Sequence, residues 1–291
     1  MNTMVIDVPE GVGSVSWWSL PGNANRDELV TACQNAGLDT KFIPSVPTAD
    51  TCLQRALEDV FKDRNTLVKK SKSGFAVLPK GVDENGNPEF RTNITASLLT
   101  ERRQFPGLDI QGCGTSYQDA IREAYVANQS LLAQQELSAM MVALVRSLNG
   151  IGLHDRGRMY FIPTTEIERW KAYSQAIGSV CQLKVFNLPT MRVDEAIDVL
   201  GASVQKEVSE RITEINATIR TWMQEVEDAK ANGGSVRKIR SDAIDNQEKE
   251  IERLIALATT YQTVLGTNLE TLKQAAEDAH CALMEAHIAR L

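Results

Sequence analysis

An apolar stripe in the C-terminal third of the chain constrains the fold more than any other feature of the sequence. Between residues 193 and 226, large apolar residues recur roughly every 3.7 positions, which is the period of one helix face. The stripe consists of Val193, Ile197, Leu200, Val204, Val208, Ile212, Ile215, Ile219, Trp222 and Val226. It predicts one continuous helix of about 40 residues, roughly 60 Å long.

Two further apolar stripes follow and predict two more helices. Ala231–Ser235 contains two adjacent glycines, which predicts a tight turn into an antiparallel helix, and Gly266 marks the next junction. Because such long helices depend on burial of their apolar faces, we expect this arm to self-associate as a dimer or a higher even-numbered oligomer. The expected interface positions flank the stripes and are Val199, Met223, Ile244, Ile255 and Val264.

The preceding part of the chain mixes strand and helix patterns. Residues 15–20 alternate as a strand, and a helix capped by Asn25 is expected over Arg26–Ala36. A second helix is expected after a cap at Thr48 or Asp50.

Runs of β-forming residues between 66 and 100 predict an antiparallel meander, with a turn at 83–88. One long buried helix is expected from Ser116 to about Leu148. The sequence thus predicts an α+β fold, with an α+β body over residues 1–190 and a long-helix arm over residues 191–291.

A β-α-β module is expected near the end of the body. Its predicted parts are a strand at 158–163, a helix at 165–177 and a strand at 182–188. Strands joined through a helix are typically parallel, so we expect this module to extend the N-terminal sheet with two parallel strands.

Composition narrows the class of protein. The formal charge is −7, the wrong overall sign for a protein that coats nucleic acid. Five cysteines are scattered without a C-x-x-C pair, which is typical of reduced thiols rather than of a disulfide framework or a zinc knuckle. No apolar run approaches the roughly 18 residues that a membrane span needs. We therefore expect a cytoplasmic protein without membrane anchoring.

Three segments hold residue types suited to chemistry. Gly112–Ser116 precedes a predicted helix and could hold an anion, although it lacks the lysine of a phosphate-binding loop. The loop around His154 and Asp155 could support a hydrolase, but no nucleophile signature accompanies it. His280 and His287 share a predicted helix face, yet lack the closer pairing of helical zinc motifs. We expect no cofactor, no metal and no catalytic residues.

Basic clusters and tryptophans mark possible contacts with partners. Short clusters at 69–72, 102–103 and 237–240 leave contact with nucleic acid open as an alternative, but no aromatic interleaving supports base stacking. The pair Trp17 and Trp18 can anchor an interface, while core packing explains at least the inward-facing one equally well. The expected partner contacts are Trp17, Trp18, Arg237, Lys238 and Arg240.

Several short motifs resemble a known family. Trp17–Pro21, Pro47–Leu57 and above all Gly157–Pro163, which a predicted helix follows, resemble an uncharacterised family of proteins carried by bacteriophages, plasmids and other mobile elements. The resemblance extends loosely over most of the chain, and implies a location in the bacterial host cytoplasm and a phage-versus-host role. It supplies no activity and no functional residues.

Together these features favour a non-enzymatic, oligomeric protein that binds itself and a host protein, with inhibition of an anti-phage defence system as its role. The first alternative is a nucleic-acid-associated protein of phage or plasmid replication. The second alternative is a hydrolase that uses His154 and Asp155.

Overall fold

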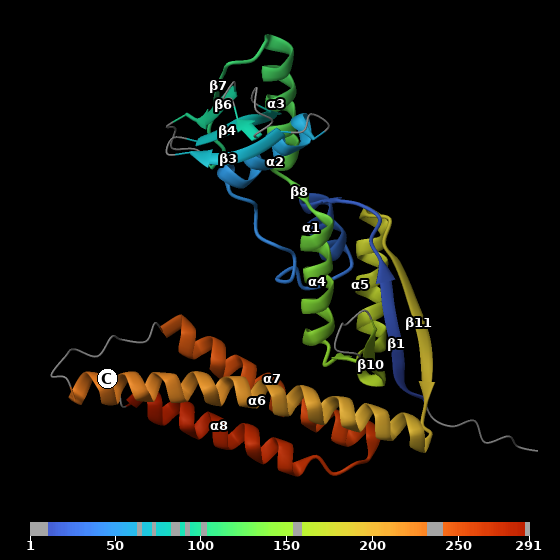
Figure 1. Ribbon diagram of the computed structural model, residues 1–291. Coiled ribbons are helices and arrows are strands. Elements are labelled where there is room, and N and C mark those ends of the chain that lie inside the picture. The colour runs from blue at the N-terminus through green and yellow to red at the C-terminus, as the bar shows by residue number, and fades with distance from the viewer. Residues whose placement is uncertain are drawn as a thin grey trace, which may run out of the picture. The chain divides into compact units, whose positions relative to one another are not determined.

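The chain forms two compact units of mixed α and β structure, which confirms the predicted α+β class. The computed structural model describes residues 11–62, 66–71, 74–82, 88–90, 94–99, 104–153, 159–231 and 241–288 (Figure 1). The first unit comprises Met1–Ser19, Met141–Ser174 and Lys184–Leu291, and the second comprises Leu20–Met140 and Gln175–Leu183. This division differs from the boundary expected near residue 190, because the long helices share a unit with the first sheet.

An antiparallel sheet in the order β11-β1-β10-β9 forms one layer of the first unit. Its strands are β1 (Gly11–Ser19), β9 (Ile151–Gly152), β10 (Tyr160–Pro163) and β11 (Lys184–Met191). Helix α5 (Ile167–Val180) connects β10 to β11, and both strands run antiparallel to β1. The predicted β-α-β module is therefore confirmed in its parallel strands, but β1 lies between them.

The first unit also contains three long helices, α6 (Asp194–Ala231), α7 (Ser241–Leu265) and α8 (Glu270–Ile288), and the second half of α4 (Gln134–Ser147). Figure 1 shows the three long helices packed side by side. Most of the predicted stripe on α6 is buried in a core that also holds Phe161 of β10 and Tyr261 of α7. The predicted long helix is confirmed, while the expected turn after Ala231 lies outside the described residues, which resume at 241.

Gly266 ends α7 as the sequence predicts. Its φ of +69° is in the left-handed region, which glycine adopts without a Cβ clash, and its N–H donates to the Gln262 carbonyl. The Arg192 guanidinium donates to the Leu265 carbonyl at 3.0 Å, so the last turn of α7 is capped by a side chain from the start of the bundle.

Packing within the chain buries two of the five expected self-association positions. Ile244, only 5% exposed, and Val264 belong to the core of their own chain, and Met223 and Ile255 pack partly against that core. The core that covers them contains residues of all three predicted helices. Of the five positions, Val199 on α6 keeps a large exposed surface, at 59%.

The second unit packs helices on an antiparallel sheet in the order β3-β4-β6-β7, with β5 paired to β4, which confirms the meander. Asn25 and Thr48 cap their helices as predicted. The elements of this unit include α1 (Arg26–Asn35), α2 (Ala49–Phe61), β3 (Thr66–Ser71), β4 (Gly74–Val82), β5 (Pro88–Phe90), β6 (Ile94–Leu98), β7 (Leu108–Gln111) and α3 (Thr115–Asn128).

The single helix expected from Ser116 to Leu148 is wrong. Helix α3 ends at Asn128, and α4 (Gln134–Ser147) begins only after β8 (Leu131–Leu132), which pairs with β2 (Ala24–Asn25). The buried Asn128 amide donates both to the Ala124 carbonyl and to Asp59 of α2. These contacts favour a helix end over continuation, and an apolar pattern alone does not reveal them.

Candidate interaction surfaces

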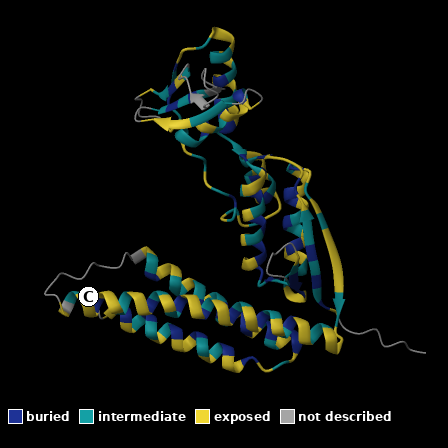
Figure 2. Ribbon diagram, viewed as in Figure 1, coloured by how far each residue is buried: buried dark blue, intermediate teal, exposed yellow. Residues whose placement is uncertain are grey.

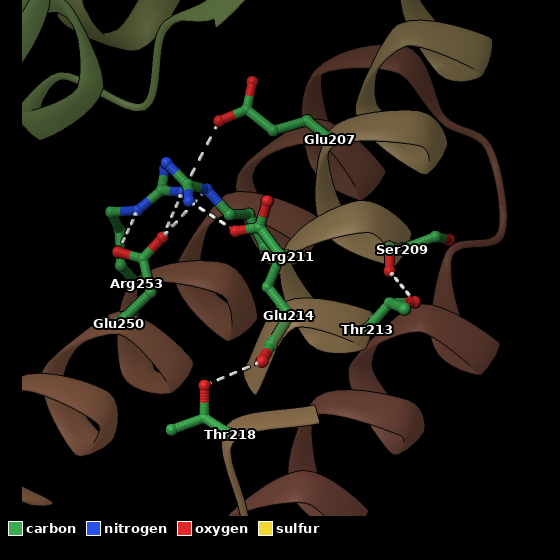
Figure 3. A network of polar contacts seen from close by, with 8 residues as sticks. All are labelled: Glu207, Ser209, Arg211, Thr213, Glu214, Thr218, Glu250 and Arg253. Atoms are coloured by element: carbon green, nitrogen blue, oxygen red, sulfur yellow. Dashed lines mark hydrogen bonds and ion pairs between the residues drawn. The ribbon is translucent and has the colours of Figure 1, made fainter. Parts of the chain in front are cut away.

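A charged network joins α6 to α7 within the first unit (Figure 3). Glu207, Arg211 and Glu214 lie on one face of α6, because their spacings of four and three residues follow the helical period. Arg253 donates two hydrogen bonds, of 2.9 and 3.0 Å, to Glu250, the residue three positions before it on α7.

Two contacts of this network cross between the helices. Arg253 Nη2 lies 3.4 Å from Glu207 Oε1, and Arg211 Nε lies 3.8 Å from Glu250 Oε1. Later positions on α6 therefore meet earlier positions on α7, which shows that these helices are antiparallel. Arg211 also pairs with Glu214 at 2.6 Å along α6.

Arg253 is the most enclosed charge of this network, with 19% of its side chain exposed. Burial opposes its positive charge, but the hydrogen bonds and charges of Glu250 and Glu207 outweigh burial and raise the pKa of the guanidinium. Its Nη1 atom is buried and finds no hydrogen-bond partner among the described residues. The network thus fixes a charged group at the helix interface without satisfying all of its donors.

Two tyrosines lie near the Glu207 end of the network. Burial, followed by the negative charge of Glu207, raises the pKa of Tyr261 well above its ordinary value. Burial also raises the pKa of Tyr160, whose ring belongs to β10, with Arg146 and Glu207 acting in opposite directions. Both hydroxyls therefore stay protonated at neutral pH and contribute no negative charge.

A pocket of about 270 Å³ opens beside this network. Residues of α4, α6 and α7 line it: Arg146, Arg211, Glu214, Ile215, Thr218, Asn246, Gln247 and Glu250. Arg211, Glu214 and Glu250 neutralise one another in part, whereas the exposed Arg146 guanidinium forms no ion pair or hydrogen bond within the described residues. The lining carries two arginines, two glutamates and two side-chain amides, which are groups that can pair with charged or polar ligands.

A second surface lies at the β11 edge of the sheet. Trp17 of β1 stacks on Phe186 of β11, with ring centroids 5.4 Å apart. Phe186 and Leu188 are 44% and 59% exposed, although large apolar side chains usually avoid water. Figure 2 shows that much of β11 is exposed.

The two consecutive tryptophans, Trp17 and Trp18, pack against different ring partners. Trp18 stacks on Tyr160 at 5.0 Å and also contacts Trp170 of α5, which is fully buried. Trp18 is thus a packing residue, and Trp17 lies beside the exposed edge.

Arg237, Lys238 and Arg240 lie outside the described residues, as do His154 and Asp155 of the hydrolase alternative.

The other two candidate sites that the sequence suggests, at Gly112–Ser116 and at His280, have the following surroundings. Gly114 precedes α3 and caps it without a side-chain hydrogen bond, and the neighbouring Ser116 is exposed. His280 Nε2 lies 3.6 Å from Glu248 on α7. Within the described residues no group of three or more metal-ligating side chains gathers.

The basic clusters are placed only in part. Lys70 pairs with Asp50 at 2.7 Å, so one of its cluster's charges is compensated. Arg102 and Arg103 fall outside the described ranges.

None of the helices that the structure describes is long and apolar enough to cross a membrane.

Sequence reasoning missed the pocket. Its one signal was the charged series Glu207, Arg211 and Glu214 beside the apolar stripe, a pattern common on solvated helix faces. The meeting with Arg146 of α4 depends on tertiary packing and leaves no sequence pattern.

Comparison with known proteins places the chain in a family but assigns no activity. No curated protein and no solved structure matches it. The model of one family matches residues 11–290, which is nearly the whole chain. The chain therefore belongs to a family of unknown function (DUF6744).

Proposed function

We propose that this protein is a non-enzymatic, oligomeric binding protein that holds a protein target through the pocket beside Arg146. The observation that carries the proposal is that exposed Arg146, which forms no ion pair with any described residue, lines a pocket together with polar groups. Arginine is enriched at the centres of protein interfaces, where its fixed fork of donors binds carboxylates.

The chemistry of the lining indicates what the target presents. Arg146 offers a positive charge, and the side-chain amides of Asn246 and Gln247 offer further donors. Glu214 and Glu250 are already held by Arg211. An acidic side chain of the target would pair with Arg146, while the backbone of the same target segment would accept hydrogen bonds from the side-chain amides of Asn246 and Gln247. The target is therefore a protein with an exposed aspartate or glutamate.

The biological setting of this proposal is a bacterial host cell. The resemblance of Gly157–Pro163 and its neighbouring motifs to proteins of mobile elements supports a phage or plasmid origin, and with it inhibition of a host defence system. All five cysteines are free, as is usual in a reducing cytoplasm. We place the protein there.

A pull-down with matched charge variants tests the proposal. The tagged chain is expressed in a bacterial host, and the proteins retained by the natural chain, Arg146→Glu and Arg122→Glu are compared quantitatively. Arg122 is an exposed arginine on α3, and its one ion pair with a described residue is to Asp119 of the same helix. We expect one host protein that the natural chain and Arg122→Glu retain and Arg146→Glu loses. Equal retention by all three chains contradicts the proposal.

A further inference from the structure

We infer that β11 is the interface between two copies of this chain, which pair their β11 strands antiparallel about a twofold axis at Asn187. This inference deepens the oligomeric part of the proposed function and moves the interface away from the long helices. It rests on the register of β11, on its single proline and on the order of its exposed side chains.

One side of β11 is occupied and the other is open. All eight residues of the strand lie beside β1, from Lys184 opposite Ser19 to Met191 opposite Gly11, with one irregularity near Gly11. Strand β11 ends the sheet order within the described residues, so its outer backbone groups have no strand partner there. Such an edge is a template for another strand unless charges, bulges or cover protect it.

The proline fixes which backbone groups point outward. Pro189 lies opposite Ser14, and it has no N–H to exchange with β1. It therefore takes a position whose polar groups face away from β1. Because antiparallel positions alternate, Val185 and Asn187 also direct their N–H and C=O groups outward, while Phe186 and Leu188 bond to β1.

With a twofold axis at Asn187, outward N–H groups of one β11 strand lie opposite outward C=O groups of the other. Asn187 of each copy donates its N–H to the Asn187 carbonyl of the other. Val185 lies opposite Pro189 of the second copy, and donates to the proline carbonyl. The absent proline N–H leaves the Val185 carbonyl at the open edge, where water reaches it. Four backbone hydrogen bonds result, and the proline is tolerated.

The same register pairs the exposed apolar side chains. Phe186 lies opposite Leu188 of the second copy, and each pair forms twice because of the symmetry. Trp17, stacked on Phe186, continues this apolar surface onto β1. Lys184, the one charged residue of β11, lies opposite Thr190 rather than opposite another lysine. A second copy therefore fits this edge without charge repulsion.

Light scattering at tens of micromolar protein tests the dimer. We expect the natural chain at twice its mass of 32.1 kDa. Leu188→Glu places a charge against Phe186 of the other copy, and Val185→Pro removes an outward donor while keeping the bonds to β1. Both should scatter as monomers. Val199→Glu, which changes an equally exposed valine on α6, should remain dimeric. Leu188 is exposed, so Leu188→Glu is decisive even if Val185→Pro fails to fold.

Amide hydrogen exchange supplies a second readout. In the natural chain the amides of Val185 and Asn187 should exchange slowly, and Leu188→Glu should accelerate them at least tenfold without affecting Phe186. A monomeric natural chain, a dimeric Leu188→Glu chain or loss of the dimer in Val199→Glu overturns the inference. Arg146→Glu should stay dimeric, so a failure of the dimer and a failure of the target pocket remain distinguishable.

Discussion

Arg253 of α7 reaches across the bundle to Glu207 of α6, with 3.4 Å between Nη2 and Oε1. Burial makes this contact more consequential than the ion pairs on outer helix faces, because half-buried charges lose hydration that their partners must replace. The pair also links two helices whose apolar faces share one core.

Replacing Arg253 should therefore destabilise the first unit. We expect Arg253→Met to lower the free energy of unfolding by about 1–3 kcal/mol, since Glu207 loses its partner on α7 and Glu250 loses the two hydrogen bonds from Arg253. The control is Lys206→Met, which removes an exposed lysine 3.9 Å from Glu210 on the same helix and should cost less than about 0.5 kcal/mol. Urea unfolding measures both, and equal costs would show that burial adds nothing to the Arg253 pair.

Two buried tyrosines should respond oppositely to loss of the hydroxyl. Tyr125 donates to the Pro106 carbonyl at 3.1 Å, so Tyr125→Phe should cost about 1 kcal/mol. The Tyr261 hydroxyl is buried and has no hydrogen-bond partner in the described part of the chain, so Tyr261→Phe should be neutral or stabilising. Thermal unfolding of the two variants decides the point; a larger loss for Tyr261→Phe would refute this account of its hydroxyl.

The second unit should lose stability in acid through Glu136. Burial raises the pKa of Glu136, but the hydrogen bonds from Arg55 and from the Ala133 N–H outweigh burial, so the pKa lies below its ordinary value of 4.5. A lowered folded-state pKa gives stability that is present above the unfolded-state value and is lost as pH falls through the folded-state value.

Glu136→Gln should remove part of this acid dependence. We expect a loss of about 1 kcal/mol at pH 7 and a smaller difference from the natural chain below pH 4 or so. Denaturant melts across this range provide the measurement. A constant difference at every pH would mean that the Glu136 charge contributes nothing.

Ile244 should behave as a core residue. Ile244→Ala should lower the free energy of unfolding by about 2–4 kcal/mol, because it leaves a cavity between packed helices. Val199→Ala, at an exposed position of α6, should change it by less than about 0.5 kcal/mol. If the two substitutions cost the same in urea unfolding, the three-helix core is packed differently.

The sequence was most informative where one local pattern decides the structure. The period of the α6 stripe predicts a long helix, and Asn25, Thr48 and Gly266 predict helix boundaries that local hydrogen bonds and φ angles confirm. These signals act within a few residues, so no knowledge of the tertiary structure is needed to interpret them.

The sequence predicts less well those features that depend on contacts between segments far apart in the chain. Ile244 flanks a stripe and looks available for an oligomer, yet it is buried in the core that the three helices share. Asn128, at the break, bonds to Asp59 of another helix, and the pocket forms where Arg146 of α4 meets α6 and α7. These contacts join residues far apart in the chain, so no periodicity or spacing in the sequence predicts them.

The affinity of the purified target for Arg146→Glu tests the central claim most directly. Calorimetric titration should give a dissociation constant at least tenfold weaker than that of the natural chain, equivalent to about 1.4 kcal/mol, because an acidic partner then meets a negative charge. Arg122→Glu should bind like the natural chain. An unchanged dissociation constant for Arg146→Glu would contradict the assignment of the pocket as the target-binding site.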